Sequence, residues 1–396
     1  MGKEDIIEKS FRNVIQYLIK SDYSGFDPYD GANSQLTLIN NNKYGRFIST
    51  YLNKFSPFNL RYLFKIPVSK QNQALAFIGR AMIKDYKTYK EQINYIADCL
   101  AQDTLIKSYG YHCWDAHGIP LQVRFAYKPV GKTDIVGNDA IGRFFFELYK
   151  ADPKEQYKEF FISVCELFQS QLKTNWNQKH FYRYTPHTLK HNWCYNASAI
   201  GASYVEMVSK SFLPDYDKTF TSQCLKDIIE HQKPEGHWYY SLNLDTGYEK
   251  PQVDFHQGFV LDAILDHMLL YGLEEPFLSS YKKGLEFYYQ KQFLPNGQGI
   301  YRYPRKWPVN IHNQAQGIIT FTRAAAAGIG EEYHQFARTI AQWTIQNMQD
   351  KDGHFYFLKY PLFTNKIPYI RWSDAAMAYA LAVLLEYEKK LQHQNA

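Results

Sequence analysis

The stretch DFHQGFVLDAIL, residues 254–265, opens with acidic, aromatic and imidazole side chains and continues as an apolar helical sequence. Comparable openings recur in the second half of the chain and read His191-Asn192-Trp193, His312-Asn313-Gln314 and Arg371-Trp372-Ser373-Asp374. The steps from residue 192 to 255, 312 and 373 are 63, 57 and 61 residues. A regular period of this size is typical of stacked supersecondary units, each with room for two helices, a turn and a short hairpin.

Helical periodicity carries this pattern over most of the chain. The first helix of each pair is rich in small and apolar residues, as in GIITFTRAAAAG at 317–328, which predicts burial on most sides. The second helix is amphipathic, as in YHQFARTIAQWTIQNM at 333–348, and is expected to face solvent on one side. We expect inner helices at 72–85, 137–150, 193–209, 255–271, 313–327 and 372–390, and outer helices at 88–104, 155–173, 217–232, 276–292 and 330–349.

The number of helices is the number needed to close a ring. Six inner and five outer helices leave one place, which the N-terminal helix 4–20 fills beside the C-terminal helix 372–390. We therefore expect an all-α fold, an (α/α)6 toroid formed by residues 1–396 as a single domain, with an open solenoid as the alternative. Pro/Gly/Asn/Asp clusters followed by aromatic residues predict short β-hairpins on the rim where the inner helices begin, at 232–240, 292–301 and 349–357. The remaining stretches are expected to be an irregular segment and a long loop, at 21–66 and 109–136.

Composition restricts the partners and the compartment. The net charge of +6 comes from basic and acidic residues mixed along the chain, so we expect no nucleic-acid partner, although an acidic substrate is compatible with it. The five cysteines are scattered and odd in number, which favours a reducing compartment. The start of the chain lacks the apolar core of a signal peptide, and no apolar run is long enough to span a bilayer. We expect a cytoplasmic protein without an integral membrane segment.

The rim of the predicted ring is where chemistry is expected. Helix N-termini carry unsatisfied N–H groups and partial positive charge, which favour anionic or hydroxyl-rich ligands. The proton-transfer candidates are Asp254, Asp374 and His256, because paired carboxyl groups or an imidazole can act as general acid and base. Tyr301 and Tyr369 are further catalytic candidates, since a phenol can donate a proton to a carbanion-like intermediate. Helix capping remains the alternative role for the two aspartates.

Substrate-binding candidates lie in the same clusters and in two loops. Arg302 and Arg371 are expected to hold a carboxylate, because guanidinium groups bind carboxylates in bidentate fashion. The other binding candidates are Asp27, Tyr29, Asp30, Trp114, Asp115, His191, Asn192, Trp193, Trp238, Tyr303, His312, Asn313 and Trp372. The structural alternatives are turns for the loop aspartates, hydrogen-bonded core positions for the histidines and core packing for the tryptophans.

Nucleotide and metal signatures are weak or missing in the sequence. It contains no Walker A, GxGxxG or GxSxG pattern. His112-Cys113 with Cys194 matches no standard zinc spacing. We therefore expect no metal and no cofactor.

Two resemblances extend this interpretation. The segment Gln232-Lys-Pro-Glu-Gly-His-Trp238 resembles the QW motif of terpene cyclase and protein prenyltransferase toroids, but no DxDD or DDxxD signature accompanies it. The segment Gly25-Phe-Asp27-Pro-Tyr29-Asp30-Gly31-Ala-Asn33-Ser34, the Trp114 loop and the segment Asn365-Lys-Ile-Pro-Tyr369-Ile-Arg371-Trp372-Ser373 together resemble VpsJ-type bacterial polysaccharide biosynthesis proteins over nearly the whole chain.

The segments 310–323 and 368–374 are also similar to the helical domain of glucuronyl C5-epimerases, which belongs with unsaturated glucuronyl hydrolases among carbohydrate-active α/α toroids. The similarity covers the C-terminal half, and this chain lacks the β-rich region that precedes the helical domain in those epimerases.

These resemblances imply an enzyme of cell-surface polysaccharide (capsule, exopolysaccharide or lipopolysaccharide) synthesis or modification. Its substrate would be a glycan, expected to be acidic, on which the enzyme would act by acid–base chemistry as a hydrolase, a lyase or a uronate epimerase. They leave room for peripheral association with a polysaccharide assembly complex. The alternatives are an isoprenoid enzyme of the terpene-cyclase type, expected to have a funnel lined mainly by Phe and Leu, and a non-catalytic glycan-binding scaffold.

Overall fold

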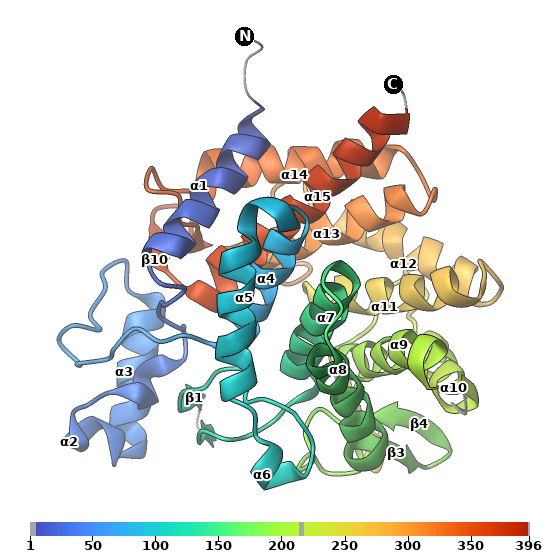
Figure 1. The fold of residues 1–396 in the computed structure, drawn as a ribbon, viewed down its shortest axis with the longest axis horizontal. Helices are drawn as coiled ribbons and strands as arrows, with labels where there is room; N and C mark the ends of the chain where they lie inside the picture. Colours follow the sequence, from blue (N-terminus) through green and yellow to red (C-terminus); the bar gives the residue numbers. More distant parts are fainter. Residues whose placement is uncertain (1–4, 125, 214–217, 395–396) are drawn as a thin grey trace.

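Six inner helices form a closed ring in the computed structural model, which describes residues 5–124, 126–213 and 218–394 (Figure 1). Each inner helix packs against the next one along the chain, and the last returns to pack against the first. The inner helices are α4 (Asn72–Ile83), α7 (Ile135–Ala151), α9 (Tyr195–Phe212), α11 (His256–Tyr271), α13 (Ile311–Ala326) and α15 (Ala375–Gln394). The contact between α15 and α4 makes this a closed (α/α)6 toroid and excludes the open solenoid.

The outer helices each pack on an inner partner. They are α5 (Tyr86–Gln102), α8 (Glu155–Leu167), α10 (Lys218–Glu230), α12 (Phe277–Gln292) and α14 (Glu332–Met348). The first helix, α1 (Ile6–Lys20), lies against α14 and α15, in the place that the sequence predicted for it. Residues 4 and 217, the first residues of two predicted helices, lie outside the described part of the chain.

The difference between inner and outer helices follows from their side chains. Helix α9 is buried on nearly all sides and carries small residues such as Ala199 and Ala202. Helix α14, in contrast, buries Phe336 and leaves Gln335 exposed. Small residues also let neighbouring helices approach closely. A Cβ on Gly258 of α11 would lie 2.5 Å from Gln316 Cγ of α13, so only glycine fits this contact.

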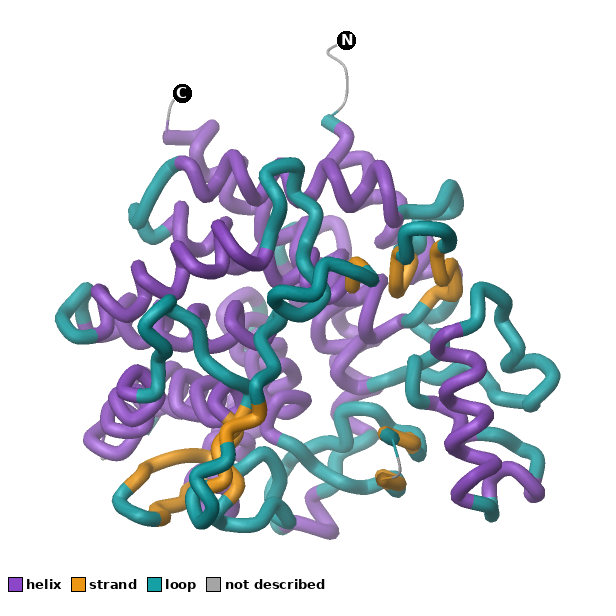
Figure 2. The backbone as a smooth tube through the Cα atoms, turned by 180° about the vertical axis from the view of Figure 1, so that it is seen from behind, coloured by secondary structure: helices purple, strands orange, loops and turns teal. Residues whose placement is uncertain are grey.

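Strands are short and lie in the connections that lead into the inner helices (Figure 2). They form two antiparallel hairpins and two three-stranded antiparallel sheets. The hairpins are β1 (Leu121–Val123) with β2 (Ala126–Lys128), and β3 (Lys173–Trp176) with β4 (Lys179–Tyr182). The sheets are β5 (Asn192–Cys194), β6 (Ser241–Asn243) and β7 (Glu249–Lys250), and β8 (Val309–Asn310), β9 (Tyr356–Lys359) and β10 (Thr364–Pro368). The predicted hairpins at 292–301 and 349–357 are turns closed by single β-bridges, Phe293 to Gly299 and Gln349 to Phe355, and residues 232–240 form a turn that leads into β6.

One repeated hydrogen bond ties these connections to the ring. In five of the six repeats, a polar side chain near the start of the inner helix accepts a backbone N–H from the preceding turn or hairpin. The acceptor and donor residues are Asn138 with Trp114, Ser198 with Tyr182, Gln257 with Trp238, Gln314 with Gly299, and Asp374 with Phe355, over distances of 2.7 to 3.1 Å. The sequence period is therefore, in large part, the spacing of these structural hydrogen bonds.

The two stretches expected to be irregular contain more structure than the sequence pattern indicated. Residues 21–66 hold the short helix α2 (Thr37–Asn40) and the longer α3 (Lys43–Phe55), which lie outside the ring (Figure 1). The prediction of an irregular segment was wrong for α3. Its apolar residues recur at helical spacing, but the run Asn40-Asn41-Asn42 directly before them favoured a loop. Helix α6 (Ile106–Tyr109) and the β1–β2 hairpin occupy part of the predicted long loop. Among the described residues, no helix combines the length and apolarity needed to cross a membrane.

Candidate active site

A cavity of about 370 Å³ runs down the centre of the ring. Every inner helix contributes a side chain near its start, or just before it, and another seven residues later, two turns deeper. The upper level, nearest the rim, consists of Gln73, Val136, Asn196, Phe255, His312 and Trp372. The lower level consists of Arg80, Arg143, Ser203, Asp262, Ile319 and Tyr379. Three of the four rim clusters seen in the sequence, 254–257, 312–314 and 371–374, place at least one side chain in this central space, and the cluster 191–193 places none.

His256 lines the upper part of this cavity and is oriented by a buried carboxylate. Its Nδ1 forms a short hydrogen bond with Asp254 Oδ1, and its backbone N–H donates to the same oxygen over 3.3 Å. The other oxygen of Asp254 accepts from Gln252 over 2.7 Å. Burial opposes ionisation of Asp254, but the attraction and hydrogen bonds of His256 outweigh it and lower the pKa of the carboxyl. Asp254 thus fixes the imidazole through Nδ1, so Nε2 is the ring nitrogen that could exchange a proton with a ligand.

A second imidazole, that of His312, lies on the adjacent helix. The ring of Phe255 lies between the two histidines, with its centroid 4.2 Å from His256 and 4.6 Å from His312. Burial, followed by the nearby Arg371 and His256, lowers the pKa of His312 to about 3. His312 Nδ1 is buried without a hydrogen-bond partner. A neutral imidazole with an open nitrogen is therefore held beside the Asp254–His256 pair.

Arg371 provides a fixed cation at the upper level. Its Nε and Nη2 lie 3.0 and 2.7 Å from Oδ2 of the fully buried Asp27. The guanidinium also lies 4.9 Å from the ring of Trp372, whose Nε1 is buried without a partner. Because Asp27 and two glutamines restrain one side of Arg371, its position is set before a ligand arrives.

The deeper part of the cavity is a network of paired charges. Arg143 contacts Asp139 over 2.7 Å and Asp266 over 2.9 Å, and Arg323 forms a short ion pair with Asp266. Arg80 contacts Glu147 over 2.7 Å. Burial raises the pKa of these acids, and the attraction of the arginines lowers it. The attraction prevails for Asp266 and Glu147, whose pKa is lowered, and burial prevails for Asp139, whose pKa is raised. Nearly every charged side chain in this deeper part of the cavity, which we call the floor, therefore forms an ion pair with a side chain of opposite charge.

Asp262 is the exception at the lower level. Burial raises its pKa to about 6, and the attraction of Arg323 only partly opposes this. Its Oδ2 accepts from Gln316 over 2.7 Å, whereas Oδ1 lacks a hydrogen bond and lies 3.5 Å from Arg323 Nη1. This carboxyl can therefore carry a proton near neutral pH within the cavity.

Four further cations surround the rim. Lys54 lies over the ring of Tyr29, which contacts Trp372, and Lys250 lies over the ring of Tyr240, which contacts His256. Arg302 lies 3.5 Å from Asp254. Arg124 follows β1, and its backbone N–H donates to Tyr51, a neighbour of Lys54. Burial, together with the repulsion of Arg302 and Arg124, lowers the pKa of Lys54 to about 8. The rim thus concentrates positive charge from four separate parts of the chain.

The structure brings only some of the predicted site residues together. His256, His312, Arg371 and Trp372 line the cavity. Asp254, Asp27 and Tyr29 contact these residues, Arg302 lies 3.5 Å from Asp254, and Asp115 lies 3.5 Å from the cavity residue His117. Tyr301 lies beside Arg302, its ring centroid 5.3 Å from the guanidinium.

The other predicted residues are engaged elsewhere. Trp114, Trp193 and Trp238 are fully buried in the core, as the structural alternative proposed. Asp374 accepts the N–H of Phe355 and does not line the cavity. The remaining contacts are Tyr369 with Asn53, Asp30 with Arg61, His191 with Asp245, Asn192 with Asn243, Asn313 with Ile300, and Tyr303 with Phe287.

Sequence reasoning missed the deeper charges, including Asp139, Arg143, Asp262, Asp266 and Arg323. The helical spacing could have identified them. Arg143, Asp262, Asp266 and Arg323 lie seven or eleven residues beyond an upper-level residue of their own helix, and Asp139 lies within one turn of one, so all share its helix face. The rim cations Lys54, Arg124 and Lys250 gave no comparable signal, since they come from unrelated loops and elements.

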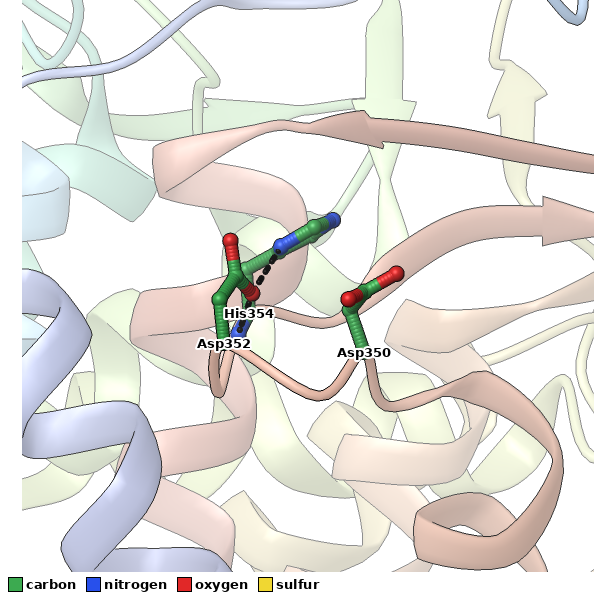
Figure 3. A group of neighbouring side chains, drawn as sticks. All are labelled: Asp350, Asp352 and His354. Carbon is green, nitrogen blue, oxygen red and sulfur yellow. Dashed lines mark hydrogen bonds and ion pairs between the residues drawn. The ribbon is translucent and has the colours of Figure 1, made fainter.

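One group of side chains has the composition of a metal site. Asp350, Asp352 and His354 lie close together in the turn before β9 (Figure 3). Both ring nitrogens of His354 are already engaged, Nδ1 with Asp352 over 2.5 Å and Nε2 with the carbonyl of Lys366 over 2.9 Å, and Tyr356 donates to Asp350. The group is explained as a hydrogen-bonded turn.

No known protein family and no curated protein sequence matches the chain. Solved structures do resemble it in fold. A GH76 alpha-mannanase of Bacteroides thetaiotaomicron superposes with a TM-score of 0.69 at 12% identity, covering 99% of this chain and 98% of that one. A sugar epimerase from a ruminal bacterium gives 0.63 at 11% identity over 96% and 99% of the two chains. An unsaturated glucuronyl hydrolase specific for heparin gives 0.60 at 10% identity over 98% of each. The chain therefore has the α/α-toroid fold found in these carbohydrate-active enzymes.

Proposed function

We propose that the chain is a sugar-modifying enzyme that moves protons to and from a sugar carbon, in the manner of an epimerase or isomerase. The observation that carries the proposal is the Asp254–His256 pair with His312 beside it, facing one cavity. His256, oriented by Asp254, can take a proton from a ligand carbon and return one to it, and the neutral His312 can hydrogen-bond to the same ligand. The cavity also contains four arginines and five acidic side chains, a lining unlike the Phe- and Leu-rich funnel expected of an isoprenoid enzyme.

The substrate that we propose is an acidic glycan. Arg371 is fixed in the cavity, and Lys54, Arg124, Lys250 and Arg302 lie around its rim. A uronate carboxylate near Arg371 would stabilise negative charge developing at the adjacent carbon, which is the charge that proton abstraction creates. We further propose, from the resemblance to VpsJ-type proteins, that this reaction belongs to cell-surface polysaccharide synthesis or modification.

The comparisons support this class of reaction, because the structural relatives include a sugar epimerase and an unsaturated glucuronyl hydrolase. Hydrolysis is the second candidate, favoured by one specific observation. Asp262 is a cavity carboxyl with a pKa raised to about 6, as a glycosidic acid catalyst requires.

One experiment separates these reactions. The protein is incubated with uronic-acid-containing oligosaccharides in D2O, and products are followed by NMR and mass spectrometry. Deuterium incorporation at a sugar carbon without new reducing ends supports the proposed reaction, and new reducing ends support hydrolysis. Binding without either product over hours indicates a glycan-binding scaffold.

The matched variants are His256→Gln and His187→Gln. His256→Gln is expected to lower turnover by about 10² to 10⁴, the usual contribution of a general acid or base, with little change in stability. His187 is exposed and away from the cavity, so its substitution should leave turnover unchanged. Equal activity of the two variants would exclude His256 as the base.

A further inference from the structure

Helix α3 is amphipathic in the opposite sense to an ordinary surface helix. The side packed against the protein carries Ser49, Thr50 and Asn53, all fully buried. The opposite side carries Tyr44, Ile48, Leu52 and Phe55, all exposed. A helix with solvent on one side normally shows its polar residues to that solvent, so the exposed apolar face of α3 points to something that covers it.

The exposed apolar surface continues beyond α3. Leu38 of α2 is 85% exposed, and Phe58, Tyr62 and Leu63, which follow α3, are 73%, 77% and 73% exposed. We call residues 37–65 the lobe; it stands outside the ring of helices, with α2 packed against α3 (Figure 1). Scattered exposed apolar residues are normal on a protein surface, but this many within one short segment are not.

The charges of the lobe have one sign. The sequence contains no Asp or Glu from residue 31 to residue 84. Within the lobe, Lys43 and Lys65 are exposed, and Arg46 and Lys54 are half-buried. The only buried cation of the lobe, Arg61, is neutralised by Asp30 from outside it. Apolar side chains and unpaired lysines therefore share one surface without a local acidic residue.

The geometry points to an anionic lipid bilayer as the occupant, with α3 lying in the plane of the membrane surface. Exposed Leu, Ile, Phe and Tyr side chains would enter the boundary between headgroups and acyl chains, while the lysines would contact acidic headgroups. A second copy of the chain fits less well, because a two-fold contact would bring two basic, acid-free surfaces together. This inference does not depend on the proposed reaction.

The lobe is firmly connected to the candidate active site. The backbone carbonyl of Asn53 accepts a hydrogen bond from Tyr369, three residues before the upper-level residue Trp372. The carbonyl of Lys54 accepts one from Asn365 of β10. Lys54 itself lies over Tyr29 beside Trp372. A membrane bound by the lobe would therefore hold the rim of the cavity in a fixed relation to the bilayer.

Vesicle co-sedimentation tests the inference with the full chain. We expect binding to phosphatidylcholine vesicles that contain phosphatidylglycerol, and at least about tenfold weaker binding to vesicles of phosphatidylcholine alone. The triple variant Ile48→Ser/Leu52→Ser/Phe58→Ser should lose at least about tenfold in affinity for the anionic vesicles. Replacing Lys43 and Lys65 by Gln should cost about fivefold for each residue, the effect of one basic residue near such a surface.

Matched controls keep this test decisive. Leu362→Ser and Leu189→Ser remove leucines that are exposed outside the lobe, and they should bind as the wild type does. Thermal melting confirms that each variant is folded. Failure of the wild type to bind anionic vesicles, or equal binding by the triple variant, would overturn the inference. A wild-type dimer that the triple variant converts to a monomer, measured by light scattering, would assign the surface to a second copy instead.

Discussion

The upper and lower levels of the cavity are built from equivalent positions of the same helices, yet they differ in how their polar groups are satisfied. At the lower level and just beneath it, Arg143, Arg323 and Arg80 are matched with carboxylates. At the upper level, His312 Nδ1 and Trp372 Nε1 have no partner. Buried polar groups are normally hydrogen-bonded, so the unsatisfied ones mark where a ligand would complete the structure. We infer that the paired charges of the lower level stabilise the ring, and we propose that the unsatisfied groups of the upper level, together with Asp262, meet a ligand.

The sharpest test of this difference is Arg143→Met. The substitution leaves Asp139 without its buried partner and Asp266 with only Arg323. We expect the free energy of unfolding to fall by about 3–5 kcal/mol, measured by urea denaturation, because an uncompensated buried charge is costly. Lys158→Met, which removes an exposed ion pair with Glu155, is the control and should change stability by no more than about 1 kcal/mol. A small effect of Arg143→Met would mean that the floor is not the stabilising level.

Substitution of Asp374 tests whether a rim residue that points away from the cavity stabilises the fold instead of taking part in catalysis. Its Oδ1 holds the N–H of Phe355, and burial raises its pKa to about 7. We expect Asp374→Ala to lower the free energy of unfolding by about 1–3 kcal/mol through the lost hydrogen bond.

Asp374→Asn keeps an acceptor and should preserve both stability and turnover. Because the native carboxyl binds its proton more tightly than the unfolded one, the wild type should lose stability as pH rises from about 4 to 7, and Asp374→Asn should lack this loss. Loss of turnover in Asp374→Asn would instead support its prediction as a catalytic residue.

His312 tests the upper level by pH. Its folded-state pKa of about 3 lies below the ordinary value of 6.5, so the unfolded chain takes up the proton first as pH falls. The wild type should therefore lose stability below about pH 6.5, by at most about 2.7 kcal/mol at pH 4.5, and His312→Gln should lose less over the same range. Parallel pH profiles of unfolding for the two proteins would show that His312 is not held neutral.

Much of the fold could be predicted from the sequence because helix period, small-residue content and turn signals are local properties. The expected helix at 255–271 is α11, from His256 to Tyr271, and the expected closure by the first helix is a contact of α1 with α14 and α15. Helix α3 was missed although its apolar residues recur at helical spacing, because the Asn-rich stretch before it favoured a loop. That its apolar side is the exposed one is a tertiary feature.

The site was less accessible from sequence for a geometric reason. Residues two positions apart on a helix point to nearly opposite sides. Phe255 and Trp372 face the cavity, whereas Gln257 and Asp374, two residues later, face the turns outside. The recurring clusters contain both kinds of position, and only packing tells them apart.

The sequence by itself determined the number, order and inner or outer character of the helices that form the ring, since these follow from repeat length and hydrophobic pattern. Only the tertiary structure decided which rim side chains share the cavity, how the deeper charges pair, and that α3 turns its apolar face outward. Those features depend on distances between residues far apart in the chain, and such distances are fixed when the ring closes.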